Sequence, residues 1–319
     1  MSPASNETEH VSRQPPAETE TAAERTWWER YASNLTTSGI PNVSRQVIEA
    51  DSRYIVERGV LGAGEPRDAR WPDGRVRRGL VMGAVQSGKT ASMLGVAAIC
   101  LDADVDMVVV LGGTRISLWR QTIERVGLQL DRADLGSSAE RARHRLLVPS
   151  LDAALSDDPS QTPARLYDIS QPQLRRAVQS RRPLIAVVMK NAHHLRAIGR
   201  VVDERLVPII NRERRPFHLL VIDDEADDGS ILDARVEQRI NPALQDLKQV
   251  PRAIVDIWEH RPHTGQTASP HLYATYVGYT ATPQANFLQS DHNPLAPTDF
   301  AVALRTPAQH GELTPRGTT

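Results

Sequence analysis

The sequence has few of several residue types, and each scarcity excludes a class of protein. Among 319 residues there is one cysteine, Cys100, which excludes an internal disulfide and any metal knuckle built from CxxC pairs. Apolar runs are all shorter than the roughly 18 residues of a membrane-spanning helix, and the polar N-terminal region has no signal-peptide core. We therefore expect a cytoplasmic protein in a reducing environment, without a membrane segment.

Lysine is also scarce, and the charge is nearly balanced. The formal net charge is -1, so no overall positive field attracts nucleic acid. Only three of the 38 basic residues are lysine, at positions 89, 190 and 248, which leaves 35 arginines. Arginine is a good bidentate phosphate ligand, but a GC-rich genome produces the same bias. Composition alone therefore does not indicate a nucleic-acid partner.

The first part of the chain divides into two segments. Residues 1–24 are rich in Glu, Ser, Thr, Pro and Ala, and we predict a disordered tail because large apolar side chains are missing there. Helical periodicity then predicts helices at 26–36 and 43–59. These form an N-terminal helical segment within residues 25–77.

From residue 78 onward, short apolar runs alternate with helical stretches. Runs that are apolar on both faces are typical of buried strands in a parallel sheet. The expected strands are 79–82, 107–111, 184–189, 219–222 and 273–279, and the expected helices are 90–102, 115–130, 191–207 and 236–248. We predict an α/β lobe over 78–305, a mostly parallel sheet with helices on both faces, in which 131–182 is a polar surface excursion. Residues 306–319 are expected to be a truncated C-terminal tail.

The clearest motif is a phosphate-loop pattern. Residues 83–90 read Gly-Ala-Val-Gln-Ser-Gly-Lys-Thr and match GxxxxGK[ST]. In this motif, backbone amides of the loop cradle phosphates, the lysine reaches the β and γ phosphates, and the hydroxyl binds Mg²⁺. An apolar strand precedes the motif and an Ala-rich helix follows it, as the motif requires. We therefore predict that ATP and Mg²⁺ are cofactors, held by Gly83, Gln86, Ser87, Gly88, Lys89 and Thr90.

A second motif places acidic residues at the end of the strand 219–222. The residues that follow are Asp223, Asp224, Glu225, Ala226 and Asp227, at the sheet edge where α/β proteins bind ligands. We assign Asp224 to Mg²⁺ through water and Glu225 to the attacking water, so that the catalytic set is Lys89, Asp224 and Glu225. Asp223 could replace Asp224, and the acids could simply cap a helix.

Two further strand ends carry candidate residues. Thr280 and Thr282 follow the fifth apolar run, and their hydroxyls could hydrogen-bond to the acidic motif and couple it across the sheet. Thr114 and Arg115 could hold a nucleic-acid phosphate at a helix N-terminus, although a plain strand–turn–helix joint has the same pattern. Lys190 could be a further phosphate contact or a bare surface lysine.

In this order the motifs resemble those of superfamily 2 helicases. Residues 83–90 correspond to motif I, 114–115 to motif Ia, 224–227 to motif II and 280–282 to motif III. The flanking residues, over about 26–305, look like the Z1 domain of bacterial endonuclease-like proteins: Gly79-Leu80-Val81, Val221 to Asp227, Tyr276 to Pro283, Asn286 and Pro297 to Phe300. The resemblance implies a RecA-like ATPase lobe of a DNA-acting motor in a restriction or phage-defence system.

The chain also departs from that pattern. Only 36 residues follow Pro283, too few for the second RecA-like lobe of a helicase. We expect either a fragment of a longer protein, which we favour, or a partner that supplies this lobe and its arginine finger. Only Asp246-Leu247-Lys248 has the spacing of a PD-(D/E)xK nuclease, and it falls on an expected helix, so no cutting site is expected here.

Three functions remain open from the sequence. The first is an ATPase lobe that couples hydrolysis to action on DNA once a second lobe is present. The second is a P-loop ATPase that does not act on nucleic acid. The third is a truncated, non-catalytic module that binds nucleotide.

Overall fold

The computed structural model describes residues 26–84, 88–130, 146–156, 158, 163–230, 249–259, 265–288, 293–305 and 316–318. Several expectations lie outside these residues: the tail 1–24, the helix 236–248 with its Asp246–Lys248 pair, and most of the tail 306–319. Gln86 and Ser87 of the phosphate-loop motif also lie outside them.

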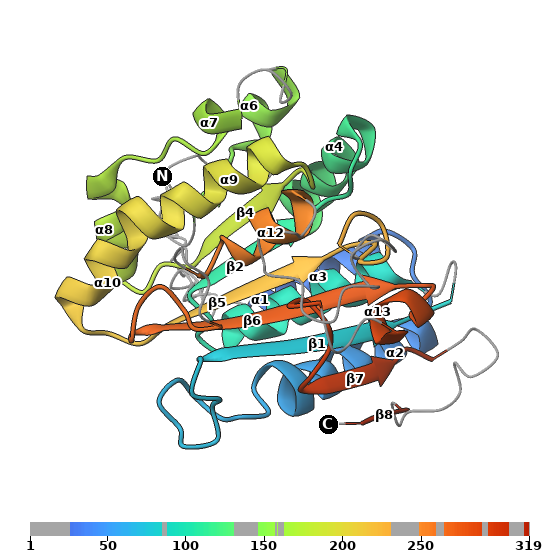
Figure 1. Cartoon of the computed structure of the whole chain (residues 1–319). Helices are drawn as coiled ribbons and strands as arrows, with labels where there is room; N and C mark the ends of the chain where they lie inside the picture. Colours follow the sequence, from blue (N-terminus) through green and yellow to red (C-terminus); the bar gives the residue numbers. More distant parts are fainter. Residues whose placement is uncertain are drawn as a thin grey trace, which may run out of the picture.

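One sheet organises the described part of the chain (Figure 1). Its strands lie in the order β3-β4-β2-β5-β6-β1-β7-β8, and every neighbouring pair is parallel except β7 with β8. The strands are β1 Val76–Met82, β2 Met107–Leu111, β3 Leu146–Val148, β4 Leu184–Val188, β5 Phe217–Asp223, β6 Leu272–Thr280, β7 Phe300–Ala303 and β8 Arg316–Thr318. The predicted α/β class with a mostly parallel sheet is confirmed.

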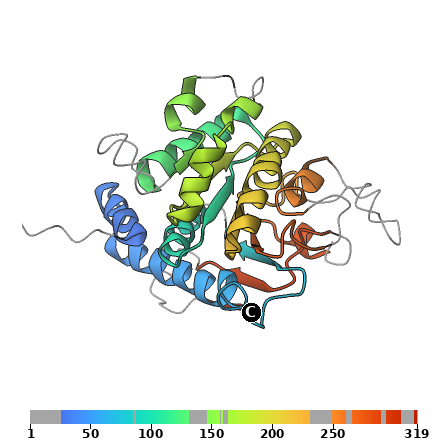
Figure 2. The same cartoon turned by 90° about the vertical axis from the view of Figure 1, so that its left-hand side faces the viewer.

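Helices cover both faces of this sheet (Figure 2). They are α1 Trp27–Thr37, α2 Asn42–Tyr54, η1 Ile55–Val60, α3 Lys89–Asp102, α4 Ile116–Arg125, η2 Val126–Leu130, α6 Leu151–Ser156, α7 Pro163–Leu166, α8 Gln171–Gln179, α9 Ala192–Arg200, η3 Val201–Leu206, α10 Val207–Glu213, α12 Gln249–Val255 and α13 Gln284–Leu288. The two expected N-terminal helices are confirmed. Both pack against α3, and buried Tyr31 and Leu35 of α1 join the main core.

The central strands are buried at every residue because helices cover them on both sides. β2 reads Met-Val-Val-Val-Leu and β4 reads Leu-Ile-Ala-Val-Val, without a polar side chain in either. Such strands form in the middle of a parallel sheet, where neither face meets water.

The register between β1 and β7 depends on a glycine. Gly79 lies opposite Phe300, and a β-carbon on Gly79 would come within 2.1 Å of the Phe300 ring. Any larger residue at position 79 would push the phenyl ring away. The glycine therefore lets β7 pair closely with β1.

One sequence expectation about the fold is incomplete. The described portion of 131–182, expected as a polar surface excursion, contains β3 at the sheet edge and the helices α6, α7 and α8. Helix α8 is polar overall but buries Leu174, Ala177 and Val178 on one face. Its polar composition reflects an exposed outer face, and the apolar residues at helical spacing were the missed signal. Strand β7 was also missed.

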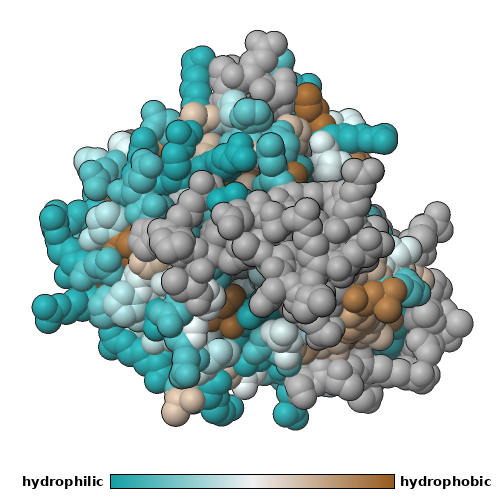
Figure 3. Space-filling model, in the orientation of Figure 1, coloured by the Kyte–Doolittle hydropathy of each residue, from teal (hydrophilic) through white to brown (hydrophobic). Residues whose placement is uncertain are grey.

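On the face shown in Figure 3, hydrophilic side chains predominate over α8, α9 and α10. Within the described residues, no helix has the length and apolarity to cross a membrane.

The topology brings the sequence motifs to one edge. Parallel strands β1, β2, β4, β5 and β6 all end at the same side of the sheet. β6 lies between β1 and β5, so the threonine motif separates the phosphate-loop strand from the acidic strand.

Candidate nucleotide site at the carboxyl edge of the sheet

The ends of the phosphate-loop motif flank the start of α3. Gly88 precedes the helix with φ +83°, a left-handed conformation that glycine adopts without strain, and a β-carbon there would meet open space. Lys89 is the first helical residue, and its Nζ contacts the Gly83 carbonyl at 3.4 Å. Gly83 is tied to β6 by a bond from its amide to the Thr280 carbonyl, 3.0 Å. An anion at this helix start would meet unpaired amides and the positive end of α3.

Thr90 has a neighbour that the sequence did not reveal. Arg125, the last residue of α4, donates from Nη1 to the Thr90 hydroxyl over 3.3 Å. The contact places an arginine beside the hydroxyl assigned to Mg²⁺. Arg125 lies 35 residues from Thr90 in the chain, and no sequence pattern links the two residues.

The acidic motif forms a turn rather than a helix start. After β5 ends at Asp223, residues 224–230 are turns and bends, so no helix begins within the acidic motif itself. Glu225 has φ +54°, a left-handed conformation that is unfavourable for a residue with a side chain. Backbone bonds hold the turn on both sides: the Asp224 amide donates to Leu111 O at 3.2 Å, and the Ala226 amide to Tyr279 O at 2.8 Å.

Asp223 is fully buried and has three polar neighbours. Its carboxylate lies 2.7 Å from Lys190 Nζ and accepts from the hydroxyls of Ser230 and Tyr276 at 2.5 and 2.7 Å. Burial and the Asp223 charge raise the pKa of Tyr276 well above its ordinary value, so this hydroxyl keeps its proton. A buried carboxylate that is paired with a lysine and accepts from two hydroxyls is not available to Mg²⁺. The arrangement favours Asp224 over Asp223 as the metal-facing acid.

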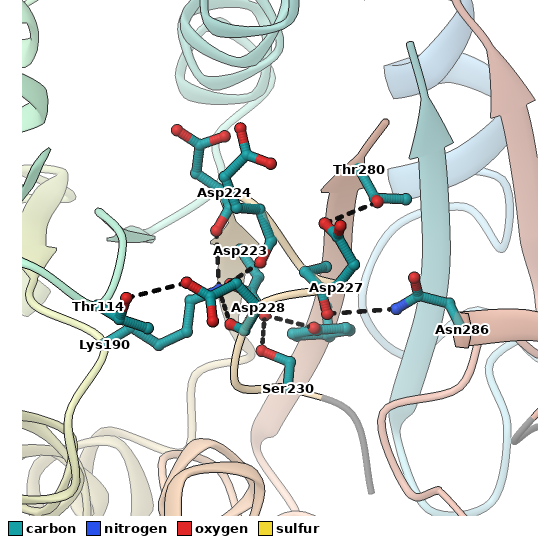
Figure 4. Close-up of polar contacts among 12 residues, drawn as sticks. Thr114, Lys190, Asp223, Asp224, Asp227, Asp228, Ser230, Thr280 and Asn286 are labelled. Carbon is teal, nitrogen blue, oxygen red and sulfur yellow. Dashed lines mark hydrogen bonds and ion pairs between the residues drawn. The ribbon is translucent and has the colours of Figure 1, made fainter. Parts of the chain in front are cut away.

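Lys190 corrects one sequence assignment. Its side chain has no exposed surface, and its ammonium is surrounded by oxygens of the acidic turn (Figure 4). A nucleic-acid phosphate cannot reach it in this conformation. The assignment of Lys190 to nucleic acid is therefore replaced by a structural one. Neighbouring Asn191 caps α9 through its side chain.

The threonine motif contacts the acidic motif as expected. Thr280 Oγ1 donates to Asp227 Oδ1 at 2.8 Å, and the Thr282 hydroxyl donates to the other Asp227 oxygen (Figure 4 shows the Thr280 contact). Burial works against the charged form, yet the bonds from Thr282 and Thr280 lower the pKa of Asp227 below its usual value. Asn286 of α13 adds a bond to the Ala226 carbonyl, 3.3 Å. The acidic turn is thus bonded directly to β6 and α13.

Two carboxylates of the turn remain free for ligands. Among the described side chains, none donates to Asp224 or Glu225, and Glu225 is exposed. Burial, reinforced by the charges of Glu225 and Asp223, raises the pKa of Asp224 to about 6. At neutral pH Asp224 is therefore mainly ionised, although burial and the neighbouring charges disfavour its charged form. A bound cation would stabilise that charged form.

The candidate nucleic-acid residues have different environments. Thr114 donates to Asp228 Oδ2 at 2.9 Å, so its hydroxyl belongs to the acidic turn in this structure. Arg115 precedes α4 and is exposed. Of the two charged candidates, Arg115 is exposed to solvent and Lys190 is buried.

Other cavities do not carry comparable chemistry. One of about 570 Å³ lies along α9 and near α12, with both basic and acidic residues, including Arg196, Arg200 and Asp256. Within the described residues, no group of three or more His, Cys, Asp or Glu side chains is arranged to hold a metal. A metal at the candidate site would therefore need oxygens from a ligand such as a nucleotide.

Several site residues were not found from sequence. Ser230 and Tyr276 hold Asp223, and Asn286 holds the turn from α13. Tyr276 is one position in an apolar run, and only the pairing of β5 with β6 brings it to Asp223.

The chain matches no known family model. No curated protein matches it significantly either.

Proposed function

We propose that this chain is an ATP-binding lobe of the superfamily 2 helicase type, which couples ATP hydrolysis to action on DNA when a second lobe is present. The observation that carries the proposal is the order of strand ends at one edge. The phosphate-loop motif after β1 and the acidic turn after β5 flank β6, whose threonines contact the turn. The resemblance to the Z1 domain, and with it a restriction or phage-defence role, belongs to this proposal.

The residues present fit Mg-ATP by their chemistry. Gly88 leaves open space where a backbone must approach phosphates, and Lys89 makes one long contact that a phosphate can replace. Asp224 and Glu225 supply two free carboxylates. Bound Mg-ATP would supply a phosphoanhydride to be cleaved, with its charge partly neutralised by the metal.

Each residue then has a separate task. Lys89 would bind the β and γ phosphates, and Thr90 and Asp224 would hold Mg²⁺. Glu225 would orient the attacking water. Asp227, bonded to the β6 threonines, would pass a change at the acidic turn to the neighbouring strand.

The nucleotide part is tested with a fluorescent ATP analogue in the presence of Mg²⁺. Lys89→Ala should abolish binding while the thermal unfolding midpoint stays near that of the wild type, because the lysine side chain is not in the core. Arg58→Ala removes one exposed positive charge on η1 as a matched control and should bind like the wild type. Unchanged affinity in Lys89→Ala would refute the site.

The DNA part is tested separately, through the salt dependence of DNA binding. Neutralising Arg115 should reduce affinity and flatten the slope of log affinity against log salt by about one unit. Arg58→Ala serves again as the control for a general charge effect. Equal slopes for both variants would favour a P-loop ATPase or nucleotide-binding module that does not act on DNA.

A further inference from the structure

The ammonium of Lys190 lies against the acidic turn, close to four oxygens (Figure 4). It lies 2.7 Å from Asp223 Oδ1 and donates to the backbone carbonyls of Asp224, Glu225 and Asp228 at 2.8, 2.7 and 2.9 Å. The three carbonyls thus accept the three ammonium hydrogen bonds, and Asp223 is the ion-pair partner. The side chain has no exposed surface.

Packing alone does not account for a lysine here. Removing an ammonium and a carboxylate from water is costly, and an apolar pair of similar volume often gives equal or greater stability. An apolar side chain at position 190 could fill the space but could not bind carbonyl oxygens. The three carbonyl contacts are what the lysine adds to the structure.

Those carbonyls belong to the residues that carry the free carboxylates. A carbonyl held in place fixes the plane of the peptide that joins its residue to the next one, because the peptide unit is planar. The carbonyls of Asp224 and Glu225 therefore fix the peptides before and after the Glu225 α-carbon. Among the described side chains, Lys190 alone donates to the carbonyls of Asp224 and Glu225. Glu225 adopts its left-handed φ of +54° at this point, where neighbouring contacts must maintain the conformation.

We propose that Lys190 is a positioning residue of the nucleotide site. By binding the carbonyls of Asp224 and Glu225, it fixes the directions in which their carboxylates meet Mg²⁺ and the attacking water. This inference rests on the proposed function. Lys190, which follows β4, would thus affect metal binding without touching the metal. It would act through the backbone of the turn that follows β5.

The test uses three variants of the full chain. Lys190→Met removes the ammonium at similar length. Lys190→Met combined with Asp223→Asn also removes the carboxylate that would otherwise be buried without a partner. Asp223→Asn alone removes the charge of the ion pair but leaves Lys190 and its three carbonyl acceptors in the chain, so it is the matched control for the ion pair.

The measurement is the dissociation constant of a fluorescent ATP analogue with Mg²⁺ and with EDTA, alongside the thermal unfolding midpoint. The ratio of the two constants reports the metal site, whereas binding in EDTA reports the phosphate loop. Both Lys190 variants should bind normally in EDTA but lose about tenfold or more of the Mg²⁺ enhancement, as residues behind metal ligands do elsewhere. Asp223→Asn should lose stability and keep the enhancement.

The outcomes separate the two proposals. Absence of Mg²⁺-enhanced ATP binding in the wild type overturns the proposed function itself. With that enhancement present, the inference about Lys190 fails if the double variant keeps it. It fails equally if Asp223→Asn loses as much as Lys190→Met does, because the ion pair and not the carbonyl contacts would then position the turn.

Discussion

Asp223 and Asp224 are neighbours in the chain with opposite surroundings. The Asp223 carboxylate is buried among Lys190, Ser230 and Tyr276. That of Asp224 faces the carboxyl edge without a side-chain donor, and burial raises its pKa to about 6. The chain leaves the sheet between them, because Asp223 is the last residue of β5 and Asp224 is the first residue of the turn. One carboxylate therefore serves folding and the other is available to a ligand.

The first prediction separates these acids by phenotype. Asp224→Asn should weaken the Mg²⁺ dependence of ATP binding with little effect on stability. Asp223→Asn should instead lower the free energy of unfolding by roughly 3 kcal/mol, because Lys190 loses its charged partner in the core. Calorimetric titration and urea unfolding measure the two effects. An exchange of the phenotypes would assign the metal to Asp223.

Glu225 has a separate prediction. Glu225 is exposed. Among the described side chains, none donates a hydrogen bond to its carboxylate, so the carboxylate is available to a water molecule. Glu225→Gln should keep Mg-ATP affinity within about twofold and lose hydrolysis, since an amide cannot accept the proton of water. Binding and phosphate release, measured on the same preparation, check this. Hydrolysis at the wild-type rate would remove Glu225 from the catalytic set.

His218 gives a prediction about pH. The residue is buried on β5, with Nε2 2.9 Å from Thr275 Oγ1, and burial lowers its pKa to about 3. The unfolded chain has a histidine pKa of about 6.5 and so binds the proton first as pH falls. The neutral histidine therefore contributes its full stability above about pH 6.5, and this contribution is lost progressively down to about pH 3.

His218→Gln tests this linkage. Urea unfolding at pH 7 and pH 4.5 should show the wild type losing up to about 1.4 kcal/mol per pH unit more than the variant does. Asp106, whose pKa burial raises to about 6, acts in the opposite sense, but it is present in both proteins and cancels. His193→Gln changes an exposed histidine and should follow the wild type. Parallel curves for His218→Gln and wild type would contradict the assignment.

At the scale of elements, a buried ion pair joins helix α2 to the segment that follows β7. Arg305, which follows β7, donates from Nε to Asp51 of α2 at 2.8 Å, and its Nη2 bonds to the Val47 carbonyl at 3.0 Å. The Arg305 side chain has no exposed surface. The pair therefore fixes the N-terminal helices to the strand beside β1.

A double-mutant cycle tests the pair. Arg305→Met should destabilise by about 3–5 kcal/mol, because the buried Asp51 charge loses the guanidinium that pairs with it. Adding Asp51→Leu should recover part of that loss. Urea unfolding of the four proteins gives the coupling energy. Additive losses in the double variant would show that the two residues act independently.

Sequence patterns predicted the strands that are buried on both faces, and they missed elements that are buried on one face only. β2 and β4 are apolar throughout, so their runs were visible without neighbours. β7 has only four residues, with alternating burial, and acquires its place through Gly79 opposite Phe300. Helix α8 hides three apolar residues within a polar stretch. The pairing partner of a strand cannot be read from the strand's own residues. A short amphipathic helix likewise gives too few apolar residues to stand out in a polar stretch.

At the scale of the whole molecule, the strand order creates the site. Five strand ends meet at one edge, and the predicted Lys89, Asp224, Glu225, Thr280 and Thr282 lie on three of them, β1, β5 and β6. Motif spacing was enough to expect this, because parallel strands end together. The role of Lys190 was not foreseeable, since it depends on β4 and β5 being separated by β2 alone. Long-range order in the sheet decides which polar residues are buried.

The most direct test of the central claim is amide hydrogen exchange with and without Mg-ATP. The account predicts slower exchange at residues 83–92 and 223–228 on nucleotide binding, and unchanged exchange in α8 and α10. Lys89→Ala should lose this protection, and Arg58→Ala should keep it. Protection confined to other elements, or none at a saturating nucleotide concentration, would contradict the nucleotide site.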